Sequence, residues 1–145
     1  MKKILAFLLV LLASPVAIAD YEVGQVWTYK TRPGEESSRL YIARIDDDGT
    51  LDDGTPYRIF HIYVDGLNMQ NRHVESGIQK VLPHAPVDEV TLDSSVIDLI
   101  DTSTVIPDIS EGYAEWTRAV EVGYFFVHSI SVQEIVEDYE EFLNQ

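Results

Sequence analysis

The apolar residues of the chain change their spacing near residue 86, and this change restricts the fold more than any other feature of the sequence. Between residues 25 and 65, apolar and polar side chains alternate in three segments, which is typical of β-strands. After residue 86, apolar residues recur every three or four positions, as in amphipathic helices. A group of strands followed by a group of helices predicts an α+β domain.

The first half predicts an antiparallel meander of three to four strands. Pro33 and Gly34 form the expected turn between the first two strands, because proline fixes φ and glycine allows the positive φ of a type II turn. The residues from 46 to 56 form a second, turn-rich connection. The three expected strands cover residues 25–31, 38–45 and 57–66.

The second half predicts two helices, a returning strand and a C-terminal helix. Pro86 suits the first position of the first helix, and Gly123 suits the C-terminal cap of the second. Ser131 and Glu134 have the spacing of a capping box at the start of the last helix. The expected elements are helices 86–100 and 108–123, the buried strand 124–130 and the helix 131–144.

The N-terminus has the three-part pattern of a secretory signal peptide. Two lysines precede the apolar run 4–12, and small residues continue as far as Ala19. A membrane anchor is the alternative, but the run is shorter than the roughly 20 residues that a spanning helix needs, and Pro15 interrupts its continuation. We therefore expect cleavage of residues 1–19 near Ala19 and a periplasmic or secreted protein without a stable membrane anchor. The remaining residues, 20–145, are expected to form one α+β domain.

The mature chain is strongly acidic. The full sequence has 25 acidic and 10 basic side chains, and removal of the signal peptide takes two lysines with it, which leaves a formal charge of −17. Such a charge repels nucleic acid and anionic lipid surfaces, and it attracts cationic partners: basic proteins, polyamines or divalent metal ions. A basic protein partner is therefore one interpretation of the acidic surface. The other is that the charge only keeps an exported protein soluble.

One face of the predicted meander is rich in rings. Alternation puts Trp27 and Tyr29 on the same side of the first strand, and His61 and Tyr63 on the same side of the third. Tyr41 lies on one side of the second strand. If these sides coincide, the sheet has an aliphatic face and an aromatic face. The aromatic face is either a second core layer or a binding surface, and the sequence leaves both alternatives open.

The turn at residues 31–36 has two interpretations of its own. As a structural turn, it brings charged residues of neighbouring strands together. As a binding site, it presents the planar guanidinium of Arg32 to a carboxylate or a phosphate, with a glutamate holding it in place. With the aromatic face, the turn supplies the candidate binding residues: Trp27, Tyr29, Arg32, Glu35, Glu36, His61, Tyr63 and His84.

No residue pattern identifies a catalytic or metal site. The chain contains no cysteine and no G-x-S-x-G motif, and its four histidines occur singly. The aspartates between 46 and 53 do not fit an EF-hand, because either alignment on a glycine puts a non-acidic residue at the first ligand position. No metal, cofactor or catalytic residue is therefore assigned.

The turn and its surroundings resemble a family of small bacterial proteins of unknown function with the pattern G-x-V-W-x-Y-K-T-R-P-G-E-E. The resemblance covers most of the expected mature chain. It implies that Trp27, Tyr29 and residues 32–36 fall on the motif of the family, and it implies no activity. The segments that carry it are GQVWTYKTRPGEE, HIYVDGLNMQN, LPHAPVDEVTLDSSVIDL and GYAEWTRAV.

The sequence is compatible with three functional hypotheses. The first is a non-enzymatic periplasmic binding or interaction protein, for example an inhibitor or immunity protein that neutralises a basic partner. The second is a small hydrolase or ligand-binding enzyme that uses Arg32, Glu35 and His61. The third is a structural envelope protein without a discrete site. The three differ in whether the aromatic face is buried or open.

Overall fold

The computed structural model describes residues 20–145, and the predicted signal peptide, residues 1–19, lies outside the described residues. The predicted α+β class is confirmed, with a five-stranded antiparallel sheet, a two-stranded sheet and three helices. In chain order the elements are β1 (Gln25–Tyr29), β2 (Arg39–Thr50), β3 (Pro56–Asp65), β4 (Met69–Gln70), β5 (Ile78–Gln79), β6 (Leu82–Val87), α1 (Glu89–Ser95), β7 (Val96–Thr102), α2 (Ser110–Glu121) and α3 (Val132–Leu143).

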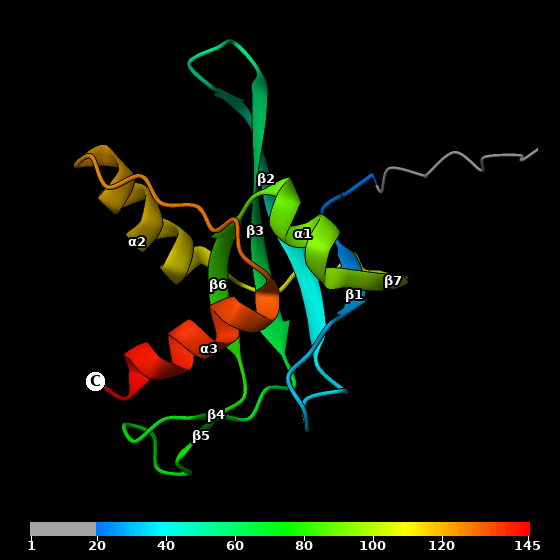
Figure 1. Cartoon of the computed structure of the whole chain (residues 1–145), viewed down its shortest axis with the longest axis vertical. Coiled ribbons are helices and arrows are strands. Elements are labelled where there is room, and N and C mark those ends of the chain that lie inside the picture. The colour runs from blue at the N-terminus through cyan, green and yellow to red at the C-terminus, as the bar shows by residue number, and fades with distance from the viewer. Residues whose placement is uncertain (1–19) are drawn as a thin grey trace, which may run out of the picture.

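The main sheet has the strand order β6-β3-β2-β1-β7, and each neighbouring pair is antiparallel. The predicted meander is therefore its centre, and two later strands close it on either side (Figure 1). Strands β4 and β5 lie between β3 and β6 in the sequence and form a separate small hairpin. The far end of the β2–β3 hairpin, around residues 46–55, projects beyond the other strands (Figure 1).

The core lies between one face of the main sheet and two helices. On this face Trp27 is paired with Leu40, and Leu40 with Val64, so the three side chains lie in one row across the sheet. Leu92 of α1 is completely buried against the same cluster. Helix α3 adds the buried side chains of its inner face, Val132, Ile135 and Val136.

The expected aromatic face divides between the two sides of the sheet, which corrects the sequence analysis. Trp27 and Tyr29 are buried in the core on the side of Leu40. Tyr41 is paired with Tyr63 on the opposite side. Side chains alternate within each strand as expected. The register between β1 and β2 decides which sides of the two strands form one face of the sheet, because a shift of one residue moves every side chain of a strand to the other face.

The Pro33–Gly34 turn is confirmed. Gly34 has φ of 87°, and the backbone N–H of Glu35 donates to the carbonyl oxygen of Arg32 at 3.1 Å. A second turn comes directly after it, because the N–H of Ser38 donates to the carbonyl oxygen of Glu35 at 2.9 Å. The two turns hold Glu35 inside the protein rather than at its surface.

The expected helix over residues 86–100 is wrong in its limits. Pro86 belongs to strand β6, opposite His61, and the helix begins only after Asp88, whose side chain accepts a hydrogen bond from the N–H of Thr91. Residues 96–102 form β7, which pairs with β1. The β-branched residues of this segment suit a strand, and the free edge of β1 provides the partner that local spacing cannot reveal.

The returning strand expected over residues 124–130 is also wrong. Only His128 forms a β-bridge, a parallel one with Val87, and the rings of Tyr124, Phe125 and Phe126 are exposed. The predicted C-terminal helix is confirmed as α3, with the capping box of Ser131 and Glu134 in place. No helix within residues 20–145 is long and apolar enough to cross a membrane.

Candidate functional site

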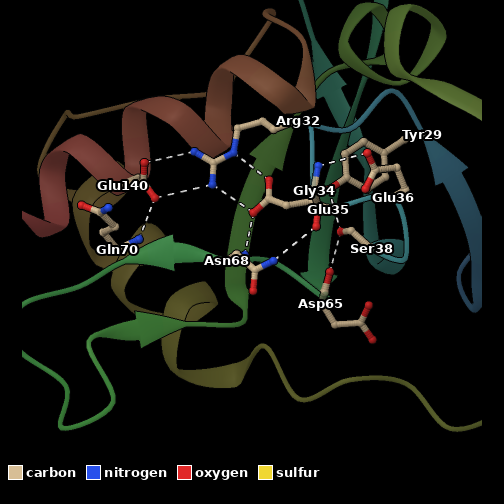
Figure 2. Close-up of polar contacts among 10 residues, drawn as sticks. All are labelled: Tyr29, Arg32, Gly34, Glu35, Glu36, Ser38, Asp65, Asn68, Gln70 and Glu140. Carbon is tan, nitrogen blue, oxygen red and sulfur yellow. Dashed lines mark hydrogen bonds and ion pairs between the residues drawn. The ribbon is translucent and has the colours of Figure 1, made fainter.

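Arg32 is bound by two glutamates, one three residues away in the same turn and one on the C-terminal helix (Figure 2). Its Nε and Nη2 donate to the two carboxylate oxygens of Glu35 at 2.7 and 2.9 Å, which is a bidentate pair. Its Nη1 and Nη2 donate to the carboxylate of Glu140, on α3, at 3.1 and 3.5 Å. A planar guanidinium thus joins the β1–β2 turn to the C-terminal helix.

Each glutamate also accepts a backbone N–H from the β3–β4 region. Asn68 donates its N–H to Glu35 and Gln70 donates its N–H to Glu140, each at 2.6 Å. Figure 2 shows the resulting cluster, in which the turn, β4 and α3 meet around one arginine. These three segments are far apart in the sequence, so the cluster is a tertiary cross-link rather than a feature of the turn alone.

The charges of this cluster are stabilised by its geometry. Burial would raise the pKa of Glu35, but hydrogen bonds from Arg32 and from the N–H of Asn68 outweigh burial and lower it below its usual value. The pKa of Arg32 is raised, mainly by its hydrogen bond to Glu35. Both side chains therefore carry full charge at neutral pH, and each one compensates the other.

Arg32 has little capacity left for an external ligand. A guanidinium has five N–H donors, and the four contacts to Glu35 and Glu140 use them almost completely. A ligand carboxylate could bind Nη1 and Nη2 of Arg32 together only by displacing Glu140. The carboxylate partner that the sequence suggests for Arg32 is thus supplied by the protein itself.

The other candidate residues near the turn are also occupied. The indole N–H of Trp27 donates to Gln25 at 3.1 Å, and the hydroxyls of Tyr29 and Ser38 are 2.7 Å apart. Glu36 is exposed and accepts the N–H of Gly34 at 3.0 Å. Tyr63 is partly buried and packs edge-on against the ring of Tyr41. The structure brings Trp27 and Tyr29 into the core and leaves only Glu36 facing solvent.

A second polar cluster lies on the opposite side of the sheet, where three neighbouring strands present Asp46, His61 and His84. Nε2 of His61 is 3.0 Å from Asp46, and Nδ1 of His61 is 2.9 Å from Nε2 of His84. The two imidazole rings are stacked, with centroids 5.1 Å apart. His61 is therefore a buried histidine whose two ring nitrogens both have partners within the protein.

We call Asp46, His61 and His84 the row. The ionisation state of Asp46, at one end of the row, determines which nitrogen of each histidine is the hydrogen-bond donor. Burial would raise the pKa of Asp46, but hydrogen bonds from Arg44 and Tyr113 outweigh it, so Asp46 is ionised. His61 must then donate through Nε2 and accept at Nδ1. His84 in turn donates through Nε2, which leaves its Nδ1 without a proton. The row therefore directs hydrogen bonds from His84 through His61 to Asp46.

Helix α2 covers this row with two aromatic side chains. The rings of Tyr113 and Trp116 each pack edge-on against His61, with centroids 4.9 Å away, and Tyr113 donates its hydroxyl to Asp46 at 3.0 Å. Gly112 permits this close approach, because a Cβ added there would lie 2.6 Å from the Cβ of His84. No residue of α2 is fully buried, so these few contacts carry its attachment to the sheet.

We expect Gly112→Ala to destabilise the protein by about 1 to 3 kcal/mol, the usual cost of inserting a methyl group into a closely packed contact. The expected sign is the test, because the same change in an unobstructed helix stabilises by up to about 1 kcal/mol. Urea denaturation measures the effect, with Glu115→Ala, at an exposed position of α2, as the control. Equal or greater stability of Gly112→Ala would contradict the close packing of α2 on β6.

The histidines of the row are held neutral. The pKa of His84 is lowered to about 4, mainly by burial and to a smaller extent by the neighbouring His61 and His128. Burial also lowers the pKa of His61, and the charge of Asp46 opposes this only in part. The row is thus an uncharged pair of imidazoles on one ionised carboxylate at neutral pH.

The structure does not assemble the enzyme site that combines Arg32, Glu35 and His61. Arg32 and Glu35 bind each other and α3, whereas His61 binds Asp46 and His84, and no hydrogen bond within residues 20–145 joins the two clusters. In the described part of the chain, no group of three or more histidine, aspartate or glutamate side chains is placed to hold a metal ion.

Sequence reasoning missed the partners that define both clusters. Glu140 carries no local signal, because it is one of four glutamates in the expected helix 131–144. Asp46 is one of three consecutive aspartates, and only the sheet register selects it. Tyr113 and Trp116 have helical spacing, which indicated a buried face but not that this face covers a histidine.

The comparisons with known proteins add no relative. No protein-family model, no curated protein and no solved structure matches the chain. The resemblance of the turn motif to a bacterial family therefore stays a prediction.

Proposed function

We propose that the chain is an exported, non-enzymatic interaction protein that binds a basic protein, as an inhibitor or immunity protein does. The observation that carries the proposal is an ordered segment of exposed aromatic rings on a molecule with a large excess of carboxylates. Export to the periplasm or the medium belongs to the same proposal, on the basis of the N-terminal sequence pattern.

The carboxylates are mostly not neutralised within the molecule. Residues 20–145 contain 25 acidic and 8 basic side chains. Ion pairs within these residues involve only four carboxylates, those of Glu35, Asp46, Glu89 and Glu140. The other carboxylates produce a field that accelerates the approach of a cationic partner.

The exposed rings lie in residues 122–126, which we call the aromatic segment. The exposed fractions are 74% for Tyr124, 60% for Phe125 and 54% for Phe126, and Val122 is 72% exposed. The segment is nevertheless anchored. The indole N–H of Trp116 donates to the carbonyl oxygen of Phe126 at 2.8 Å, and the N–H of Tyr124 donates to the carbonyl oxygen of Ala119 at 2.8 Å.

Charge and rings together favour a protein partner over simple solubility. An acidic surface that only maintains solubility has no use for adjacent exposed aromatic residues, which promote association. Aromatic residues are enriched at the centres of protein interfaces, and a segment held rigid in advance loses little entropy on binding. The surface therefore has the composition expected of a docking site for a basic protein.

Affinity capture with an engineered variant tests the proposal. Wild-type protein lacking residues 1–19 and the double variant Tyr124→Ser, Phe125→Ser are used to capture proteins from an envelope extract, at about 0.05 and 0.15 M salt. We expect wild type to retain a basic protein at both salt concentrations. We expect the double variant to bind that protein at least about tenfold more weakly, because hot-spot rings contribute more than about 1 kcal/mol each.

The double variant Ile97→Ser, Leu99→Ser is the matched control, because these residues are exposed on β7 at the opposite edge of the sheet. Equal loss in both double variants would show that exposed apolar residues in general cause retention. If every captured protein is released at the higher salt concentration, the proposal is contradicted.

A further inference from the structure

A groove beside the aromatic segment lies between β6, residues 126–128 and α3. Its volume is about 320 Å³, which is enough for one long side chain. Its floor is aliphatic, with the buried residues Leu82, Ala85 and Ile135. Aromatic rings form much of its rim: Phe126, Tyr139 and Phe142. We call this cavity the β6–α3 groove.

The walls of the groove are held in place by backbone contacts. His128 donates its N–H to the carbonyl oxygen of Pro86 at 2.9 Å and accepts from the N–H of Asp88 at 3.0 Å. The ring of Phe126 packs edge-on against that of His128, with centroids 4.3 Å apart. The opposite wall is α3, which the capping box of Ser131 begins. The groove is therefore preformed and needs no rearrangement to accept a ligand.

The polar group that distinguishes the groove is Asp138. Its carboxylate is exposed and forms no ion pair with any residue of the described chain, 20–145. Asp138 is on the same face of α3 as Ile135 and Phe142, because three and four residues separate them. A carboxylate next to aromatic rings and an aliphatic floor attracts a cation with an apolar stem.

We propose that the β6–α3 groove receives an arginine or lysine side chain of the basic partner. The inference rests on the proposed function and specifies the part of the surface that reads the partner. The aliphatic stem lies on Leu82 and Ile135, and the charged end reaches Asp138 beside the rings of Phe126 and Phe142. Arginine fits better than lysine, because its planar group both stacks on rings and binds a carboxylate through two N–H groups.

The charge of the molecule selects this occupant over others. An anionic ligand would meet Asp138 and the net negative charge of the chain. A second copy of the chain would bring an equal negative charge to the interface. A neutral apolar ligand would leave the only unpaired carboxylate of the groove lining without a partner.

The test uses two short peptides with blocked ends, one with an arginine between two leucines and the other with citrulline in its place. Citrulline keeps the shape of arginine and removes its charge. Binding to protein recovered from cells that express the full chain is followed by NMR titration at about 0.15 M salt. We expect the arginine peptide to shift the resonances of residues around the groove. We expect the citrulline peptide to bind about fivefold or more weakly.

Matched variants locate the site. Asp138→Asn and Phe126→Ala are each expected to weaken the arginine peptide about fivefold. Asp98→Asn and Leu99→Ala make the same kinds of change on β7 and are expected to leave binding within about twofold. All four residues are exposed, so the variants retain the core. Equal affinity for both peptides, or wild-type affinity of Asp138→Asn, overturns the inference.

The outcomes also separate the groove from the proposed function. Capture of a basic partner that Asp138→Asn binds as tightly as wild type supports the function and overturns the role of the groove. Peptide binding in the groove without capture of any basic protein supports the groove and contradicts the function. Sedimentation of wild type and Phe126→Ala completes the test, because a wild-type dimer that the variant abolishes means that a second copy fills the groove.

Discussion

Arg32→Ala is expected to lower the free energy of unfolding by about 3 kcal/mol. The substitution leaves Glu35, which is 2% exposed, with a buried charge and no cationic partner. Loss of one member of a buried ion pair costs about 3 to 5 kcal/mol, and we expect the lower end because the side chain of Arg32 is 16% exposed. The substitution also removes the hydrogen bond from Arg32 to Glu140, which links the turn to α3. Urea or thermal denaturation measures the loss.

Arg118→Ala is the matched control, because Arg118 is exposed on α2 and forms no ion pair within residues 20–145. We expect it to change stability by no more than about 0.5 kcal/mol. If Arg32→Ala were as stable as this control, the cluster would not be a structural cross-link. An external role for Arg32, as in the ligand-binding hypothesis, would then regain support.

The same cluster predicts an acid-dependent loss of stability. Because the pKa of Glu35 is lower in the folded protein than in the unfolded chain, the unfolded chain takes up a proton first as pH falls. The stabilisation is complete above the unfolded pKa of about 4.5 and is lost as pH falls below it. In Arg32→Ala this part of the pH dependence should shrink, because Glu35 then lacks the partner that lowers its pKa.

The second large effect is expected at higher pH, between about 6.5 and 4. The pKa of His84 is lowered to about 4 in the folded protein, so in this window the unfolded chain binds more protons than the folded one. Stability therefore falls as pH falls from about 6.5 and reaches its full loss near pH 4. The difference between the pKa of His84 in the unfolded and the folded protein corresponds to a loss of about 3 kcal/mol in the free energy of unfolding.

His84→Gln tests the origin of this slope. Glutamine retains a donor for Nδ1 of His61 but cannot take up a proton. We expect its unfolding free energy to fall less than that of wild type between pH 6.5 and 4, by up to about 3 kcal/mol. His73→Gln is the control, because His73 is exposed near the β4–β5 hairpin. An unchanged slope in His84→Gln would mean that the stacked histidines do not control acid sensitivity.

The turn at Pro33 and Gly34 was predictable, because its geometry depends on the φ angles of those two residues. The start of α3 was predictable for the same kind of reason, since Ser131 and Glu134 satisfy each other's backbone groups locally. By contrast, β7 could not be predicted, because its partner β1 lies about seventy residues earlier in the chain.

The candidate sites show the same division. Arg32, Glu35, His61 and His84 were identified from the sequence as residues of interest, and the structure places them in two separate clusters. Their partners Glu140 and Asp46 were not identified, because acidic residues are so frequent in this chain that none stands out. The buried strand expected over residues 124–130 includes the three rings of the aromatic segment, because apolar composition does not show whether a neighbour covers them.

The sequence by itself determined the α+β class, the first turn, the cap of α3 and the acidic charge, because each depends on local backbone preference or on composition. Only the tertiary structure decided which side of the sheet each ring occupies, that Arg32 binds Glu140, and that residues 122–126 remain exposed. These features depend on strand register and on contacts between distant segments. Local spacing contains neither, and so the surface that we propose for the basic partner became visible only in the folded chain.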